Sequence, residues 1–126
     1  MSNNKKWKDD WILSAIRSGY LIPQEDGTIY RRERASKDGK IISGDARLVT
    51  QCTHKKTGRV YFNLVWLGIT KSVLVNRVIA LKFLPNPDGL EQVNHKDGNK
   101  AHNALSNLEW SSGHDNEKHA HRTGLK

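Results

Sequence analysis

The sequence contains few of the residues on which several common kinds of protein depend. Its 126 residues include one cysteine, Cys52, and three prolines. A single cysteine excludes a disulfide within the chain and a zinc site made of several cysteines. No apolar run approaches the ~18 residues of a membrane-spanning helix, and the polar start has no secretory apolar stretch after it. We therefore expect a soluble, intracellular protein.

Acidic residues are scarce relative to basic ones. The chain has 21 Lys and Arg against 13 Asp and Glu, so its formal net charge is +8 with the histidines neutral. A small domain this basic is typical of proteins that bind a polyanion, and nucleic acid is the leading candidate. The alternative is a positive surface that only keeps the protein solvated. A membrane surface is a poorer partner, because no long basic amphipathic helix is visible.

Before Pro85, the hydrophobic pattern predicts two helices and several strands. Helical spacing of apolar residues favours helices over 7–18 and 76–84, the first ending at Gly19 and the second at Pro85. The segments between them are rich in alternating, β-branched or aromatic residues and are predicted strands: 28–34, 47–53, 59–67 and 70–75. We expect the last two to form a hairpin around Gly68.

Asparagine, glycine and histidine dominate residues 91–110, after the sequence Pro85-Asn86-Pro87. Asn and Gly favour turns and local side-chain-to-backbone hydrogen bonds, so this segment is predicted to be a tightly folded loop. Val93 before it and residues 108–110 after it are predicted short strands. A final helix is expected over 113–122. The predicted order is strand, ordered loop, strand, helix.

Three polar residues, two from this segment and one from the predicted final helix, can meet at one small cavity. Asn94 and His95 end the first strand, and Asn116 follows 21 residues after His95, near the start of the final helix. A hairpin folded onto a helix brings these points together. Amide oxygens are ligands that a hard divalent cation accepts. An imidazole with a pKa near ~6.5 can take a proton from water at neutral pH.

Residues 75–120 resemble the HNH endonucleases of phages and phage introns. The shared motif is a hydrophobic residue, Asp or Asn, then His-x-Asp-Gly-Asn, followed by Asn-Leu-x-Trp and a later Asn. Here it is carried by residues 93–99, 107–110 and Asn116. The resemblance implies an α+β fold, with a β-rich N-terminal half followed by a C-terminal ββα-metal (HNH, His-Me finger) motif.

The resemblance also implies a role for each matching residue. His95 matches the general base that activates the attacking water, and Asn94 and Asn116 match the two metal ligands. Asn107 matches the structural Asn of the motif, which holds the loop. The implied cofactor is one divalent ion, Mg²⁺ with Mn²⁺ tolerated. Relatives often have Asp at the position of Asn94, so this chain would lack a carboxylate ligand. His119, one turn beyond Asn116, is a further candidate to approach the metal.

The implied function is that of a metal-dependent DNA endonuclease. Such an enzyme hydrolyses phosphodiester bonds in double-stranded DNA, by nicking or by double-strand cleavage, and leaves 5′-phosphate and 3′-hydroxyl ends. We expect a monomer or homodimer in the cytoplasm, which is the host cytoplasm if the gene belongs to a phage. Residues 1–22 would form an N-terminal helical arm, 23–84 a β-rich DNA-binding region with a short helix, and 85–126 the nuclease motif.

Ten basic residues are candidates to contact DNA phosphates. They are Arg31, Arg32, Arg34, Lys55, Lys56, Arg59, Lys71, Arg77, Lys96 and Lys100. If about six of them engage phosphates, each should add about 0.9 to the logarithmic salt dependence of binding.

Two alternatives remain open at this stage. One is a catalytically weak or inactive DNA-binding protein that retains the HNH fold, which the absence of a carboxylate ligand favours. The other is an interaction protein whose basic face binds an acidic protein partner. Cleavage of plasmid DNA distinguishes the first alternative from a nuclease, and DNA affinity at low salt tests the second.

Overall fold

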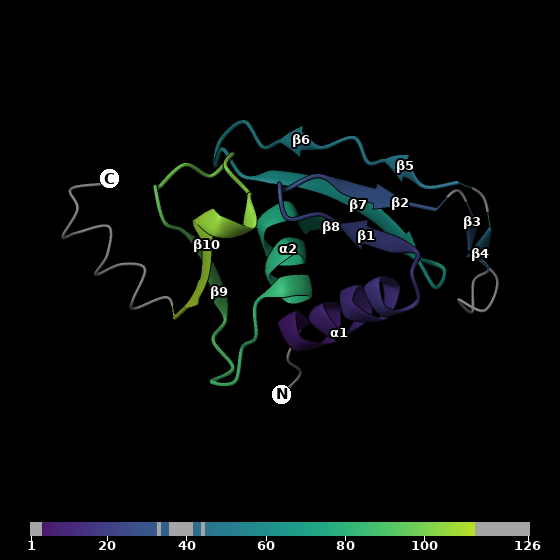
Figure 1. Ribbon diagram of the computed structural model, residues 1–126, viewed down its shortest axis with the longest axis horizontal. Helices are drawn as coiled ribbons and strands as arrows, with labels where there is room; N and C mark the ends of the chain where they lie inside the picture. The colour runs from purple at the N-terminus through teal and green to yellow at the C-terminus, as the bar shows by residue number, and fades with distance from the viewer. Residues whose placement is uncertain (1–3, 33, 36–41, 44, 113–126) are drawn as a thin grey trace.

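The computed structural model describes residues 4–32, 34–35, 42–43 and 45–112 (Figure 1). Its elements, in chain order, are α1 (Asn4–Arg17), β1 (Leu21–Pro23), β2 (Ile29–Arg31), β3 (Arg34–Ala35), β4 (Ile42–Ser43), β5 (Arg47–Leu48), β6 (Cys52–Thr53), β7 (Val60–Trp66), β8 (Ile69–Leu74), α2 (Val75–Phe83), β9 (Gln92–His95), the 3-10 helix η1 (Leu105–Asn107) and β10 (Leu108–Ser111).

All strand pairs of the described residues are antiparallel. One sheet has the order β1-β2-β5 and another the order β6-β7-β8, while β3 pairs with β4 and β9 with β10. The β7–β8 hairpin turns through Leu67 and Gly68, which both have positive φ. Paired positive φ angles suit a two-residue hairpin turn, because they match the twist of the flanking strands.

Helix α2 lies at the centre of the molecule, between the β9–β10 hairpin and α1 (Figure 1). Its residues Val75, Val78 and Ile79 are fully buried. Burial of one such side chain stabilises the fold by about 1.5–3 kcal/mol. Because α2 contacts β7, β8, β9 and β10, it packs the N-terminal β-rich part and the C-terminal hairpin around one core.

Helix α1 is fixed to this core by apolar packing and by buried tryptophan hydrogen bonds. Trp11 Nε1 donates to the backbone carbonyl of Trp66 at 2.9 Å. In turn, Trp66 Nε1 donates to Ser14 Oγ at 2.8 Å. Both indole rings are buried, so each N–H would be costly without an acceptor.

The predicted elements agree with the structure for the helices and for the long hairpin. The first helix begins three residues before the predicted start at residue 7 and ends at Arg17. Two details of the strand predictions are wrong. Residues 47–53 form two short strands, since β5 pairs with β2 whereas β6 pairs with β7. The short strand β1 was not predicted. The final helix predicted over 113–122 lies outside the described residues.

The predicted fold class is confirmed, since the chain combines few helices with antiparallel sheets. The predicted boundaries at residues 22 and 84 stay a prediction. Within the described ranges, no helix has the length and apolar character needed to cross a membrane.

Candidate active site

The β9–β10 hairpin places the two motif residues that end β9. In its antiparallel register His95 pairs with Leu108, and Asn94 pairs with Glu109. The buried Leu108 anchors this end of the hairpin to the core. The Asn-rich loop connects β9 to β10, and hydrogen bonds between its own residues hold it together.

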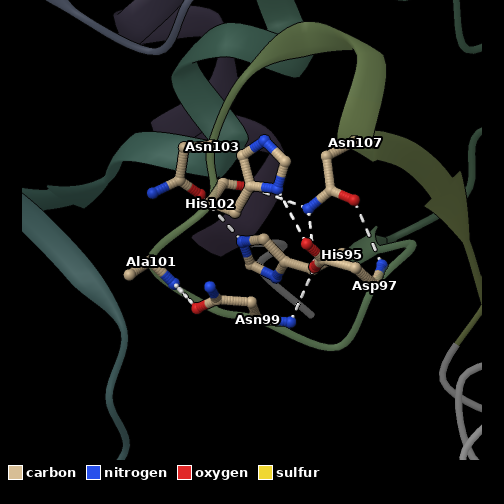
Figure 2. A network of polar contacts seen from close by, with 7 residues as sticks. All are labelled: His95, Asp97, Asn99, Ala101, His102, Asn103 and Asn107. Atoms are coloured by element: carbon tan, nitrogen blue, oxygen red, sulfur yellow. Dashed lines mark hydrogen bonds and ion pairs between the residues drawn. The ribbon is translucent and has the colours of Figure 1, made fainter.

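Asn107 holds this loop together (Figure 2). It is only 6% exposed, and its amide makes three hydrogen bonds. Its Nδ2 donates to Asp97 Oδ1 and to the carbonyl of His102, both at 2.9 Å, and its Oδ1 accepts from the Asp97 backbone N–H. These contacts are those expected of a structural asparagine, which is the role that the sequence predicts for it.

Asp97 is the second centre of the loop network. His102 Nδ1 lies 2.7 Å from Asp97 Oδ2, and the backbone N–H of Asn99 donates to Oδ1. Hydrogen bonds from His102, Asn99 and Asn107, in that order, lower the pKa of Asp97 to about 2. The carboxylate is therefore ionised at neutral pH and organises the turn at Gly98.

His95 is half-buried beside this network. Its Nε2 lies 2.8 Å from Asn103 Oδ1, and none of the described residues hydrogen-bonds to its Nδ1. Burial lowers the pKa of His95, while the hydrogen bond with Asn103 opposes that shift. The neutral imidazole is thus favoured near pH 7, and this is the form in which a ring nitrogen can accept a proton.

Asn94 lies beside a carboxylate across the hairpin. Its Nδ2 donates to Glu109 Oε2 at 2.8 Å. Because only the amide nitrogen can donate, the Oδ1 of Asn94 is left as the side-chain atom for a cation. An amide oxygen with an adjacent carboxylate suits a hard ion such as Mg²⁺, which keeps most of its water ligands. This donor set fits the predicted metal.

The second predicted metal ligand, Asn116, lies outside the described residues, as does His119. Within the part of the chain that the structure describes, no three His, Cys, Asp or Glu side chains gather as a metal-binding group. The described half of the candidate metal site therefore consists of Asn94 with Glu109 beside it.

Four of the predicted DNA-binding residues surround the turn that faces the Asn-rich loop. Lys100 Nζ donates to the carbonyl of Thr57 at 3.0 Å, which links the loop to the β6–β7 turn. The exposed Lys55, Lys56 and Arg59 lie on or next to this turn. The charges of Arg59 and Lys100 act on His95, where each lowers its pKa. Lys96 is exposed in the loop itself.

Arg77 is engaged inside the protein. Its guanidinium forms a two-pronged ion pair with Asp9 of α1, with distances of 2.6 and 2.7 Å, and donates to the Glu91 carbonyl. It also lies over the Trp110 ring, 5.4 Å from the centroid. A role of Arg77 in DNA binding stays a prediction, and a phosphate would have to displace these partners.

The remaining predicted contacts are spread over the β-rich half. Arg31 ends β2, which points away from the β9–β10 hairpin (Figure 1), and Arg32 follows it. Lys71 lies on β8, and its charge lowers the pKa of Lys8 on α1, although burial is the larger cause. The side chain of Arg34 lies outside the described residues.

The sequence reasoning missed two residues of the site, Asn103 and Glu109. Glu109 is placed beside Asn94 by the hairpin register, and a trial alignment of the two strands would have found it. The sequence contained no comparable signal for Asn103, because the motif of residues 93–99 and 107–110 does not include that position.

Comparisons with known proteins bear on the identity of this fold. No protein-family model matches the chain. Two proteins of Acanthamoeba polyphaga mimivirus, both named uncharacterized HNH endonucleases, are similar in sequence. One is 38% identical over 93 residues, which is 74% of this chain and 26% of that protein. The other is 44% identical over 76 residues, which is 60% of this chain and 19% of that protein.

A solved structure that describes DNA binding and cleavage by the HNH homing endonuclease I-HmuI is similar in fold. Its TM-score is 0.68 at 27% sequence identity, and the match covers 86% of this chain and 55% of that one. The chain therefore spans only part of the length of each relative. Taken with the His95 hairpin, these likenesses place the chain in the HNH endonuclease family.

Proposed function

We propose that this chain is a metal-dependent DNA endonuclease, which hydrolyses phosphodiester bonds to 5′-phosphate and 3′-hydroxyl ends. The observation that carries the proposal is the burial and hydrogen bonding of the His95 imidazole at the end of β9. Its imidazole is half-buried and held at Nε2, while Nδ1 has no partner among the described residues. The family relationship supplies the class of reaction.

In the proposed mechanism His95 is the general base. Nδ1 accepts a proton from water as the water oxygen attacks phosphorus, and a base positioned in this way contributes about 10²–10⁴-fold in rate. Burial keeps the imidazole neutral before the reaction. Asn107 does no chemistry in this scheme, and its three hydrogen bonds hold the loop that follows His95.

We propose that Asn94 and Asn116 hold the metal ion, Mg²⁺ with Mn²⁺ tolerated. When bound, such an ion stabilises negative charge on the scissile phosphate and on the leaving oxygen. The hydrogen bond to Glu109 fixes the Asn94 amide so that its oxygen is the atom presented. The Glu109 carboxylate also supplies nearby negative charge that the amide ligands lack, so ion affinity depends on both residues.

We propose double-stranded DNA as the substrate, bound by a monomer or homodimer. Support comes from the net charge of +8 and from the basic β6–β7 turn. A hydrogen bond from Lys100 joins this turn to the Asn-rich loop. Phosphates at this turn would lie close to His95. Because such contacts release counterions, DNA affinity should fall steeply as salt rises.

Cleavage of supercoiled plasmid tests the proposal. Relaxed or linear product is expected with Mg²⁺ or Mn²⁺ and none with a chelator. The nicks should be sealed by DNA ligase without prior phosphorylation, since the ends carry a 5′-phosphate and a 3′-hydroxyl. DNA binding without cleavage in any divalent metal would instead support an inactive DNA-binding protein. Absence of DNA affinity at low salt would support an acidic protein partner.

A further inference from the structure

The contact between His95 and Asn103 determines which ring nitrogen carries the proton. Asn103 Oδ1 lies 2.8 Å from His95 Nε2. An amide oxygen can only accept a hydrogen bond, so Nε2 must donate, and the lone pair of the neutral ring is on Nδ1. Figure 2 shows the two side chains facing each other across the loop.

Residues in the N-terminal part of the chain hold Asn103 in place. It is 7% exposed and lies against the β1–β2 turn. A Cβ placed on Gly27 of that turn would be 2.9 Å from the Asn103 carbonyl oxygen and 3.0 Å from its carbonyl carbon. Gly27 also has a φ of +93°, so an L-residue would be strained there as well.

Two further hydrogen bonds join the same segments. The backbone N–H of Leu105 donates to the Glu25 carbonyl at 2.7 Å. Gln51 Nε2 donates to the Gly27 carbonyl at 3.0 Å, which ties the turn to the segment between β5 and β6. The backbone of residues 103–105 is therefore held on one side by the β1–β2 turn.

We propose that Asn103 is a positioning residue that selects the Nε2–H tautomer of His95 and aims Nδ1 at the attacking water, and that the β1–β2 turn at Gly27 holds Asn103 in place. The β-rich half of the chain then contributes to the reaction as well as to DNA contact. This inference rests on the proposed function for its catalytic meaning. Its structural content, the tautomer and its dependence on Asn103, stands apart from DNA cleavage.

Nuclear magnetic resonance of ¹⁵N-labelled histidine in the whole chain tests the structural content. At alkaline pH, where the imidazole is neutral, long-range couplings report which nitrogen is protonated. The wild-type protein and Asn103→Asp, which keeps an acceptor oxygen, should show His95 as Nε2–H. Asn103→Ala should move the tautomer ratio toward Nδ1–H by about fivefold, which is the worth of a typical hydrogen bond.

Asn86→Ala is the matched control for this measurement. Asn86 also fixes a loop through its amide, with hydrogen bonds to both the N–H and the carbonyl of Leu90. Its substitution should leave the His95 tautomer unchanged. A wild-type His95 protonated on Nδ1 would overturn the proposal, and so would an Asn103→Ala protein with the wild-type tautomer ratio. If Asn103→Ala does not fold, the wild-type and Asn103→Asp spectra still decide.

A pair of glycine substitutions tests the role of the turn. Gly27→Ala should weaken the Nε2–H preference of His95 and slow single-turnover cleavage at saturating DNA, with DNA affinity unchanged. Gly19→Ala is the control, because Gly19 has a similar φ of +88° but nothing within 4 Å of an added Cβ. Equal effects of the two substitutions on His95 would contradict the proposed support.

Cleavage kinetics separate this inference from the proposed function. Asn103→Ala should lower the single-turnover rate about fivefold, and Asn103→Asp should restore much of it. A protein that shows the expected tautomers but cuts no DNA in any divalent metal would refute the proposed function alone. A protein that cuts DNA equally well with Ala or Asn at position 103 would refute the positioning role alone.

Discussion

Asn94→Asp places a second carboxylate against Glu109 and so tests the cross-strand pair directly. In the wild-type protein Asn94 Nδ2 donates to Glu109 Oε2 at 2.8 Å. The substitution removes that hydrogen bond, which is worth about 1 kcal/mol. It also brings together two negative charges, which repel by about 1 kcal/mol when solvent screens them. We expect the free energy of unfolding to fall by about 1–2 kcal/mol at pH 7 in a chelator.

A double-mutant cycle isolates this interaction. Glu109→Gln combined with Asn94→Asp restores a donor facing an acceptor, so the double variant should recover most of the lost stability. Metal should act in the opposite direction, because the two carboxylates of Asn94→Asp attract a divalent cation. Chemical denaturation with chelator or with Mn²⁺ measures both effects, and Mn²⁺ titration measures affinity. An Asn94→Asp protein as stable as wild type in chelator, with no gain in Mn²⁺ affinity, would refute the reasoning.

Three further predictions concern the scaffold and the loop. Ser14→Ala removes the acceptor of the buried Trp66 Nε1–H and should lower the free energy of unfolding by about 1–3 kcal/mol, whereas Ser72→Ala, at an exposed position of β8, should change it by less than about 0.5 kcal/mol in the same denaturation assay. Leu67→Asn should raise that free energy by about 0.5–1 kcal/mol, because Leu67 has a φ of +56°, which Asn tolerates better; an unchanged denaturation midpoint would contradict this. Asp97 has a pKa of about 2 in the fold and 3.8 as its ordinary value, so its stabilising contribution is complete above about pH 5 and is lost progressively as pH falls through 2. A carboxyl ¹³C titration with a midpoint near 3.8 would show that the loop network is absent.

The fold was predictable where local pattern determines structure. Apolar spacing predicted both helices, and the alternating residues around Gly68 predicted the β7–β8 hairpin. The fold was less predictable where a strand pairs with a segment that is far away in the sequence. Residues 47–53 read as one strand, yet their two ends join different sheets, and no local feature separates those partners. The three residues of β1 are too few to give a periodic signal.

The positions of the candidate site residues were predictable to a similar extent. The motif around His95 predicted the hairpin, and the structure places Asn94 and His95 at the end of its first strand, while their roles as metal ligand and base stay predictions. The motif contained no information on what holds the imidazole, because the position of Asn103 depends on packing against Gly27, far away in the sequence. The basic residues were equivalent in sequence. Tertiary structure separates Arg77, which is paired with Asp9, from Lys100, which joins the loop to the β6–β7 turn.

Single-turnover cleavage by His95→Ala tests the central claim most directly. The assay compares the variant with wild type on supercoiled DNA in Mg²⁺ at saturating protein, with a gel-shift measurement of DNA affinity alongside. If Nδ1 of His95 takes the proton from water, the cleavage rate should fall by at least about 100-fold while DNA affinity is unchanged. A variant that cuts at the wild-type rate would contradict the assignment of His95 as the base.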